Sequence, residues 1–155
     1  MERCDVEESV DRGLVKLIKK DIYLLQKETH EVSVSHRLGC YLQEVFSEFD
    51  VDCEYNRDAE AIDNKKRNES GDLVRPDIIV HKRGGSNLLA IEMKKAEKPG
   101  DGDIENLNSY IKKQKYKFGL FIGFRVSSER VIAIKRWFEA HKEPVQSELS
   151  INLSG

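Results

Sequence analysis

The sequence predicts an α/β fold with a central mixed sheet of four to five strands, flanked by helices and preceded by an extra N-terminal helix. Three observations lead to this prediction. Hydrophobic residues recur at helical spacing through residues 5–49, short hydrophobic runs dominate after residue 73, and one amphipathic segment separates those runs. The predicted order is helix, helix, strand, strand, strand, helix, strand, strand.

The first two helices are predicted over residues 5–28 and 31–49 because their hydrophobic residues recur at steps of three and four. These residues are Val10, Leu14, Leu17, Ile18, Ile22 and Leu25 in the first, and Val34, Leu38, Tyr41, Leu42, Val45, Phe46 and Phe49 in the second. A short strand is expected over residues 51–57. The polar stretch 58–72 lacks a clear period, which is typical of a loop.

Two strands of a hairpin are predicted at about residues 73–82 and 87–95. Asp101 or Asp103 can cap a helix that continues to about Gln114. The run at 117–124 is hydrophobic on both faces, as in a strand buried on both sides. A final strand is expected over residues 130–138. The tail from about Glu143 has no strong signal.

Length and composition predict one domain. The chain has 155 residues, of which 39% are hydrophobic and 35% charged, enough for a single core. A net charge of −2 excludes a global basic field, so any site for a polyanion must be local. Three widely spaced cysteines indicate free thiols rather than zinc ligands. We expect a cytoplasmic location because the N-terminus lacks a targeting pattern and no run is long enough to span a bilayer.

The hairpin contains unexpected charges. If Gly84 and Gly85 form a two-residue turn, Arg83 pairs with Ser86. The same register places Asp77 opposite Glu92 on one face of the sheet, with Cβ atoms about 5 Å apart.

Lys94 lies two residues beyond Glu92 and is expected on the same face. Two carboxylates so close repel each other unless a cation neutralises them, and a divalent ion with oxygen ligands does so. The alternative is a solvated sheet face on which Lys94 forms a salt bridge with one of the acids. The hydrophobic neighbours favour burial, and therefore a site.

The pattern Pro76-Asp77 followed by Glu92-Met93-Lys94 resembles the PD-(D/E)xK nuclease superfamily, whose fold is called restriction-endonuclease-like. The family core consists of a helix, a three-stranded antiparallel meander, a helix and a further strand. The elements predicted over residues 31–125 follow that order. The resemblance therefore divides the domain into an N-terminal helical extension at 1–30, a catalytic core at 31–125, and a C-terminal strand and tail at 126–155.

The resemblance implies roles for individual residues. Asp77, Glu92 and the backbone carbonyl of Met93 would ligate Mg²⁺, for which Mn²⁺ would substitute. Lys94 would position or activate the attacking water. An additional acid would come from the first core helix, where Glu31 is the candidate and Glu44 the runner-up. Glu31 can equally be a first-turn acid that interacts with the helix dipole.

Basic residues are candidates for contact with nucleic acid: Arg75, Lys95, Lys112, Lys115, His36, Arg37 and the cluster at 64–67. Each has a structural alternative. Lys112 and Lys115 lie near a helix C-terminus, where cations are favoured anyway, and the cluster at 64–67 can be a solvated loop. Tyr110 and Gln114 are candidates for a polar residue that reaches the site from the following helix, with packing as the alternative for each.

These features predict a magnesium-dependent nuclease that hydrolyses phosphodiester bonds, with DNA as the expected substrate and a homodimer or partner subunit as a possible assembly. The alternative is a noncatalytic member of the same fold that binds nucleic acid or a partner protein. An unrelated α/β binding domain with structural hairpin charges is a third hypothesis. The sequence does not distinguish DNA from RNA or endonuclease from exonuclease action.

Overall fold

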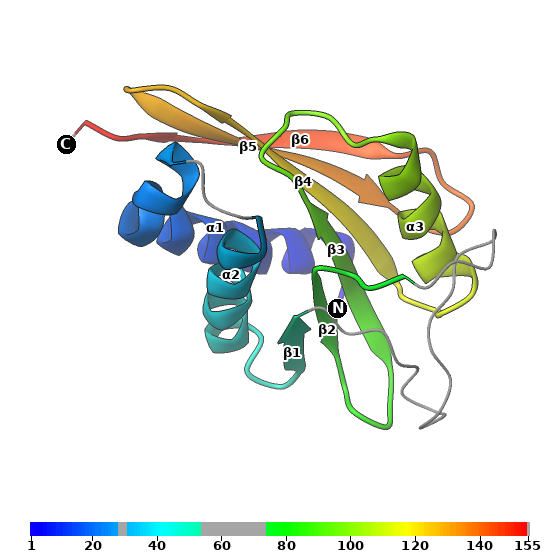
Figure 1. Ribbon diagram of the computed structural model, residues 1–155. Coiled ribbons are helices and arrows are strands. Elements are labelled where there is room, and N and C mark those ends of the chain that lie inside the picture. Colours follow the sequence, from blue (N-terminus) through cyan, green and yellow to red (C-terminus); the bar gives the residue numbers. More distant parts are fainter. Residues whose placement is uncertain (28–30, 54–73, 155) are drawn as a thin grey trace.

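The computed structural model describes residues 1–27, 31–53 and 74–154, which form a six-stranded mixed sheet flanked by three helices (Figure 1). The elements are α1 (Arg3–Gln26), α2 (Glu31–Val45), β1 (Asp50–Cys53), β2 (Ile78–His81), β3 (Asn87–Met93), α3 (Asp101–Lys112), β4 (Phe118–Val126), β5 (Arg130–Phe138) and β6 (Val145–Asn152). The α/β class and the extra N-terminal helix are as predicted. The predicted loop at 58–72 and the basic cluster at 64–67 lie outside the described residues.

The strands lie in the sheet in the order in which they occur in the chain, from β1 to β6. Neighbouring strands are antiparallel except β3 and β4, which are parallel and are connected through α3. A parallel pair requires such a crossover, because the chain must return to the starting edge before the second strand begins. The crossover places the N-terminus of α3 after the C-terminal end of β3.

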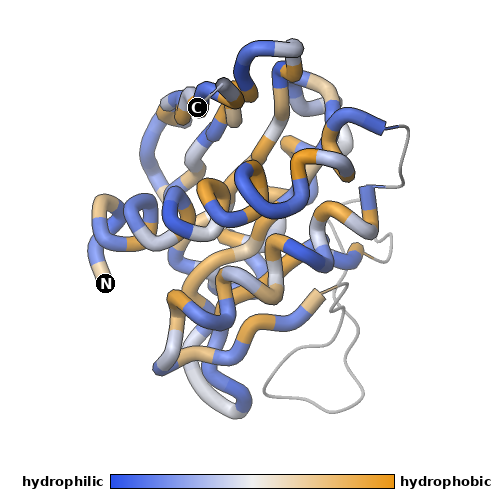
Figure 2. The backbone as a smooth tube through the Cα atoms, turned by 90° about the vertical axis from the view of Figure 1, so that its left-hand side faces the viewer, coloured by the Kyte–Doolittle hydropathy of each residue, from blue (hydrophilic) through white to orange (hydrophobic). Residues whose placement is uncertain are grey.

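The sheet has a hydrophobic core on each face. Alternate residues of a strand point to opposite faces, so Ile78 and Val80 of β2 pack with α1 and α2 while Ile79 packs with α3. Both N-terminal helices carry hydrophobic residues at helical intervals, visible as alternating orange and blue along the tube (Figure 2). The run at 118–124 is buried throughout, as predicted for a strand covered on both faces.

A buried lysine of β5 joins the sheet to helix α1. Lys135 of β5 is 2% exposed, and its ammonium lies 2.8 Å from Glu7 Oε1 and 2.6 Å from Asp11 Oδ1. Ser147 of β6 donates a hydrogen bond to the same Glu7 oxygen. A buried ammonium needs such partners, so this cluster fixes the N-terminal helix against β5 and β6.

The hairpin turn differs from the prediction. Gly85 N–H donates to the Lys82 carbonyl, and Gly84 has a φ of 71°, a left-handed value that glycine adopts without strain. His81 then pairs with Asn87, so the loop is longer than two residues and the predicted Arg83–Ser86 pair is wrong. A shift between Val80 and His81 compensates for the longer loop, and the predicted register is recovered at Ile78 opposite Ile91.

The C-terminal tail forms β6, a strand that was not predicted, so the predicted four to five strands must be corrected to six. Ile151 is the only residue of this strand whose side chain is buried. The three cysteines, Cys4, Cys40 and Cys53, are not joined in disulfides, as expected. None of the helices in the described part of the chain combines the length and hydrophobicity of a transmembrane helix.

Candidate metal and catalytic site

The two hairpin acids meet at the C-terminal end of β3. Asp77 lies directly before β2, and Glu92 is the penultimate residue of β3. Continuing the pairing of Ile78 with Ile91 by one residue places the two acids opposite each other. Asp77 Oδ2 accepts a hydrogen bond of 2.7 Å from Met93 N–H, and the carboxyl groups of Asp77 and Glu92 are hydrogen bonded to each other. The structure therefore brings together the pair that the register predicts.

Glu92 is a buried acid, with 8% of its surface exposed. Burial, reinforced by the negative charge of Asp77, raises the pKa of Glu92 from 4.5 to about 8. The charge of Asp103 acts in the same direction, whereas the hydrogen bond from Tyr110 opposes it. At neutral pH the pair thus holds a proton between its two carboxyl groups, and a cation that binds both acids would displace that proton.

Tyr110 of α3 is the helix residue that reaches this pair. Its hydroxyl is fully buried and donates a hydrogen bond of 2.5 Å to Glu92 Oε1. Burial and the adjacent Glu92 charge raise the pKa of Tyr110, so the hydroxyl stays protonated and remains a donor. Gln114, the other candidate from this part of the chain, lies two residues beyond the C-terminal end of α3, where its backbone carbonyl accepts a hydrogen bond from Asn87.

Lys94 points to the same face as Glu92, as predicted, but it forms its ion pair with α3. Its ammonium lies 3.4 Å from Asp103 Oδ2, and the same oxygen accepts a hydrogen bond from Gly100 N–H. Asp103 therefore both caps α3 and pairs with the ammonium of Lys94. The sequence predicted Asp103 only as a cap. Its position could have indicated a role in the site, because Asp103 lies in the first turn of the helix that directly follows β3.

The structure separates the two candidates for an additional acid. Glu31 begins α2, and its Oε1 accepts a hydrogen bond of 3.2 Å from Lys95 N–H, directly after β3 and Lys94. Glu44 lies at the other end of α2 and forms an ion pair with Lys16 of α1. Glu31 is thus brought to the end of β3, and Glu44 is not.

The oxygen ligands at this point suit Mg²⁺ or Mn²⁺. Both ions prefer carboxylate and carbonyl oxygens, with water completing the coordination shell. Asp77 and Glu92 supply carboxylate oxygens within hydrogen-bonding distance of each other, and Met93 lies between Glu92 and Lys94. In the described ranges, no three carboxylate, imidazole or thiol side chains are grouped closely enough to hold a metal ion. The residues present fit a site of two carboxylates plus backbone and water.

The residues predicted to contact nucleic acid lie in separate parts of the structure. Arg75 is exposed two residues before Asp77, and the Lys95 ammonium donates to the Lys27 carbonyl. Arg37 bonds to Tyr41 and Asp21, within the contact between α2 and α1.

The remaining candidates lie on exposed helix positions or beyond α3. His36 is exposed on α2, with Nε2 lying 4.0 Å from Cys40 Sγ. Lys112 is the last residue of α3, and Lys115 follows it. Lys112 is roughly 14 Å along the helix from Asp103 at 1.5 Å per residue, and two residues beyond Tyr110, whose hydroxyl contacts Glu92. The predicted contacts therefore do not form one surface around the carboxyl pair.

Similarity to known proteins does not assign this site. Comparison of the chain with protein-family models, with curated proteins and with solved structures found no match. The resemblance of Asp77, Glu92, Met93 and Lys94 to a nuclease motif stays a prediction, and the assignment of a function rests on the chemistry of the residues themselves.

Proposed function

We propose that this protein is a magnesium-dependent nuclease with a restriction-endonuclease-like core, which hydrolyses phosphodiester bonds in DNA by attack of a metal-activated water. The observation that carries the proposal is the pair formed by the buried Glu92 and the half-buried Asp77, with Lys94 two residues after Glu92 and paired with Asp103. Acids are rarely buried without a compensating partner, because burial disfavours the charged form. Perturbed acids of this kind are concentrated at functional sites.

The order of the elements supports the same proposal. From α2 to β4 the chain runs helix, three antiparallel strands, helix, and a strand parallel to β3. This is the order of the family core, with Asp77 directly before its second strand and Glu92 on its third. The site also lies at the carboxyl end of β3, where the crossover to α3 leaves the sheet.

In the proposed reaction, Asp77 and Glu92 hold the ion together with the Met93 carbonyl. When bound, Mg²⁺ lowers the pKa of a water ligand and polarises a phosphate oxygen. Lys94 would donate a hydrogen bond to the attacking water and favour its deprotonated form. Asp103 restricts where the Lys94 ammonium can lie, since the two groups are 3.4 Å apart.

Tyr110 orients the Glu92 carboxylate. Its hydrogen bond to Oε1 restricts the rotation of the carboxyl group, so Glu92 would present its other oxygen to a metal ion once the proton shared with Asp77 is lost. Because this bond favours the charged form of Glu92, it also lowers the cost of removing the proton before metal binding. Glu31, held at Lys95 N–H, is placed to bind a water of the ion.

The test is a titration of Mg²⁺ and Mn²⁺ into wild-type protein and two variants, Asp77→Ala and Asp77→Asn. The asparagine variant keeps an oxygen for Met93 N–H but removes the charge. Supercoiled plasmid, labelled single-stranded DNA and RNA are the substrates, and calorimetry follows metal binding. Glu129→Ala, which changes an exposed acid, is the matched control.

We expect metal-dependent cleavage by wild type and the control, abolished in both Asp77 variants. Metal binding at Asp77 without cleavage of any substrate would favour the noncatalytic alternative. If wild-type protein bound no metal, the acids would be structural and the proposal would be wrong.

A further inference from the structure

A hollow of about 660 Å³ opens at the opposite end of β3 from the carboxyl pair. Its size lies within the range of about 300–1,000 Å³ that is typical of ligand sites. Lining residues include Phe49, Ser86, Asn87, Lys113, Lys115 and Lys117. The start and end of β3 are roughly 20 Å apart at 3.3 Å per residue, so this hollow is distinct from the metal site.

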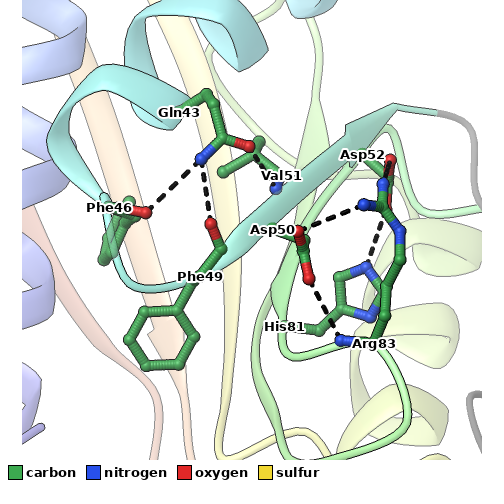
Figure 3. Close-up of polar contacts among 8 residues, drawn as sticks. All are labelled: Gln43, Phe46, Phe49, Asp50, Val51, Asp52, His81 and Arg83. Atoms are coloured by element: carbon green, nitrogen blue, oxygen red, sulfur yellow. Dashed lines mark hydrogen bonds and ion pairs between the residues drawn. The ribbon is translucent and has the colours of Figure 1, made fainter.

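Hydrogen bonds fix the side of the hollow that carries Phe49. Gln43 Nε2 donates to the Phe49 carbonyl over 2.9 Å, and Gln43 Oε1 accepts from Val51 N–H (Figure 3). Arg83, in the hairpin turn, bonds to Asp50 through both its backbone N–H and its guanidinium. These hydrogen bonds therefore hold the connection between α2 and β1 against the hairpin turn.

The opposite side is joined to the start of β3 in the same way. Lys117 N–H donates to the Asn87 carbonyl over 3.1 Å, and Asn87 Nδ2 donates to the Gln114 carbonyl over 2.7 Å. These bonds place the segment after α3 beside the hairpin. The lysines of that segment consequently lie at a preformed concave surface rather than on a solvated helix.

The hollow is strongly basic. Lys113, Lys115 and Lys117 line it, and none of the lining residues in the described part of the chain carries a carboxylate. The Lys117 ammonium lies 4.0 Å from Glu2 Oε1 and also donates to the Met1 carbonyl. In a protein with a net charge of −2, this concentration of cations produces a local positive field.

Lys115 occupies a conformation that suits glycine better. Its φ is 60°, in the left-handed region, where a side chain strains the backbone. A glycine here would relieve this strain. Lysine is thus present at a position of the hollow where glycine would be less strained.

Phe49 supplies an aromatic surface in the same hollow. It is half-buried, and the Lys82 ammonium lies 5.3 Å from its ring centroid. Sites for single-stranded nucleic acid combine cations that follow the phosphates with aromatic rings on which bases stack. We propose that this hollow binds a strand of nucleic acid, with a base against Phe49 and phosphates against Lys113, Lys115 and Lys117. This proposal does not depend on cleavage at the carboxyl pair.

The experiment measures binding of a fluorescent oligothymidine of about 12 nucleotides, within the site sizes of about 4–16 nucleotides seen in such proteins. EDTA is present throughout, and salt is varied. The test variant is Lys115→Gln with Lys117→Gln, and the control with equal charge change is Lys19→Gln with Lys20→Gln, on exposed positions of α1. An abasic oligomer of the same length and polyphosphate serve as competing probes.

We expect the affinity of the test variant to fall at least ten-fold at low salt, while the control changes little. The slope of the logarithm of the binding constant against the logarithm of the salt concentration should become shallower by about 0.7 for each phosphate contact that is lost. Wild type should bind the abasic oligomer at least five-fold more weakly, and Phe49→Leu should remove that difference. Lys115→Gly should weaken binding yet raise thermal stability. Weaker binding by a more stable protein would then be due to the lost charge and not to misfolding.

Two results would overturn the proposal. One is an equal fall in affinity in the test and control variants, which would indicate a diffuse electrostatic effect. The other is binding of the abasic oligomer or polyphosphate as tight as that of oligothymidine, which would indicate a site for anions alone. Asp77→Ala should bind normally in EDTA, because the hollow lies apart from the carboxyl pair. Binding of oligothymidine by wild-type protein that shows no metal-dependent cleavage would count against the nuclease proposal only.

Discussion

Replacing Glu92 with glutamine should stabilise the metal-free protein at alkaline pH while it abolishes metal binding. Glutamine has the shape of the protonated acid. It can still accept the Tyr110 hydrogen bond and can donate to Asp77, as the shared proton does in the wild type. It cannot ionise, so it avoids placing a second negative charge beside Asp77 in a buried site.

The magnitude follows from the pKa of Glu92, which burial and the Asp77 charge raise from 4.5 to about 8. Below pH 4.5 the carboxyl is protonated in folded and unfolded chains alike. Between pH 4.5 and about 8 the unfolded chain releases this proton and the folded chain retains it, so the free energy of unfolding falls as pH rises. At about 1.4 kcal/mol per pH unit, the total loss is on the order of 5 kcal/mol.

The assay is urea denaturation in EDTA from about pH 5 to about pH 9, comparing wild type with Glu92→Gln. We expect similar stability near the acid end and a difference of about 2–5 kcal/mol in favour of the variant at the alkaline end. At an m-value of roughly 1–3 kcal/mol per M, this shifts the urea midpoint by about 1 M or more. Glu129→Gln, at an exposed position, should follow wild type at every pH. Parallel pH profiles for wild type and Glu92→Gln would refute the reasoning.

Two further substitutions test the surroundings of the site. Tyr110→Phe removes a hydrogen bond to a charged group, worth about 1.5–3 kcal/mol, so Mg²⁺ affinity near neutral pH should fall at least ten-fold by calorimetry; unchanged affinity would mean that Tyr110 does not orient Glu92. Gly123→Ala places a Cβ about 2.3 Å from the Ala96 carbonyl oxygen, behind the segment that follows β3, and should cost about 1–3 kcal/mol in urea denaturation. Gly102→Ala, where a Cβ meets nothing within 4 Å, should cost no stability and serves as its control.

The helices and the buried strands could be predicted because their signals are local. Periodic hydrophobic residues define α1, and the range predicted for β5 coincides with the observed one. The strand β6 could not be found in this way. Its side chains alternate between exposed and half-buried positions, with only Ile151 buried, and its stability comes from backbone pairing with β5. An edge strand of this kind is defined by its neighbour rather than by its own composition.

The facing of Asp77 and Glu92 was predictable, although the turn used to derive it was not the one observed. Two errors compensate in the register: the loop is longer than two residues, and a bulge at Val80 and His81 absorbs the difference. Hydrophobic side chains on both faces of β2 and β3 require this register, because a slip by one residue would exchange the two faces.

The sequence by itself determined the α/β class, the two N-terminal helices and the identity of the acids at the end of the hairpin. Only the tertiary structure decided what surrounds them. Tyr110 and Asp103 reach the acids because the crossover returns α3 over β3, and burial under that helix raises the pKa of Glu92. The same crossover carries Lys115 away to the opposite end of the sheet. Such distances depend on how the chain packs against itself, which neither periodicity nor motif spacing specifies.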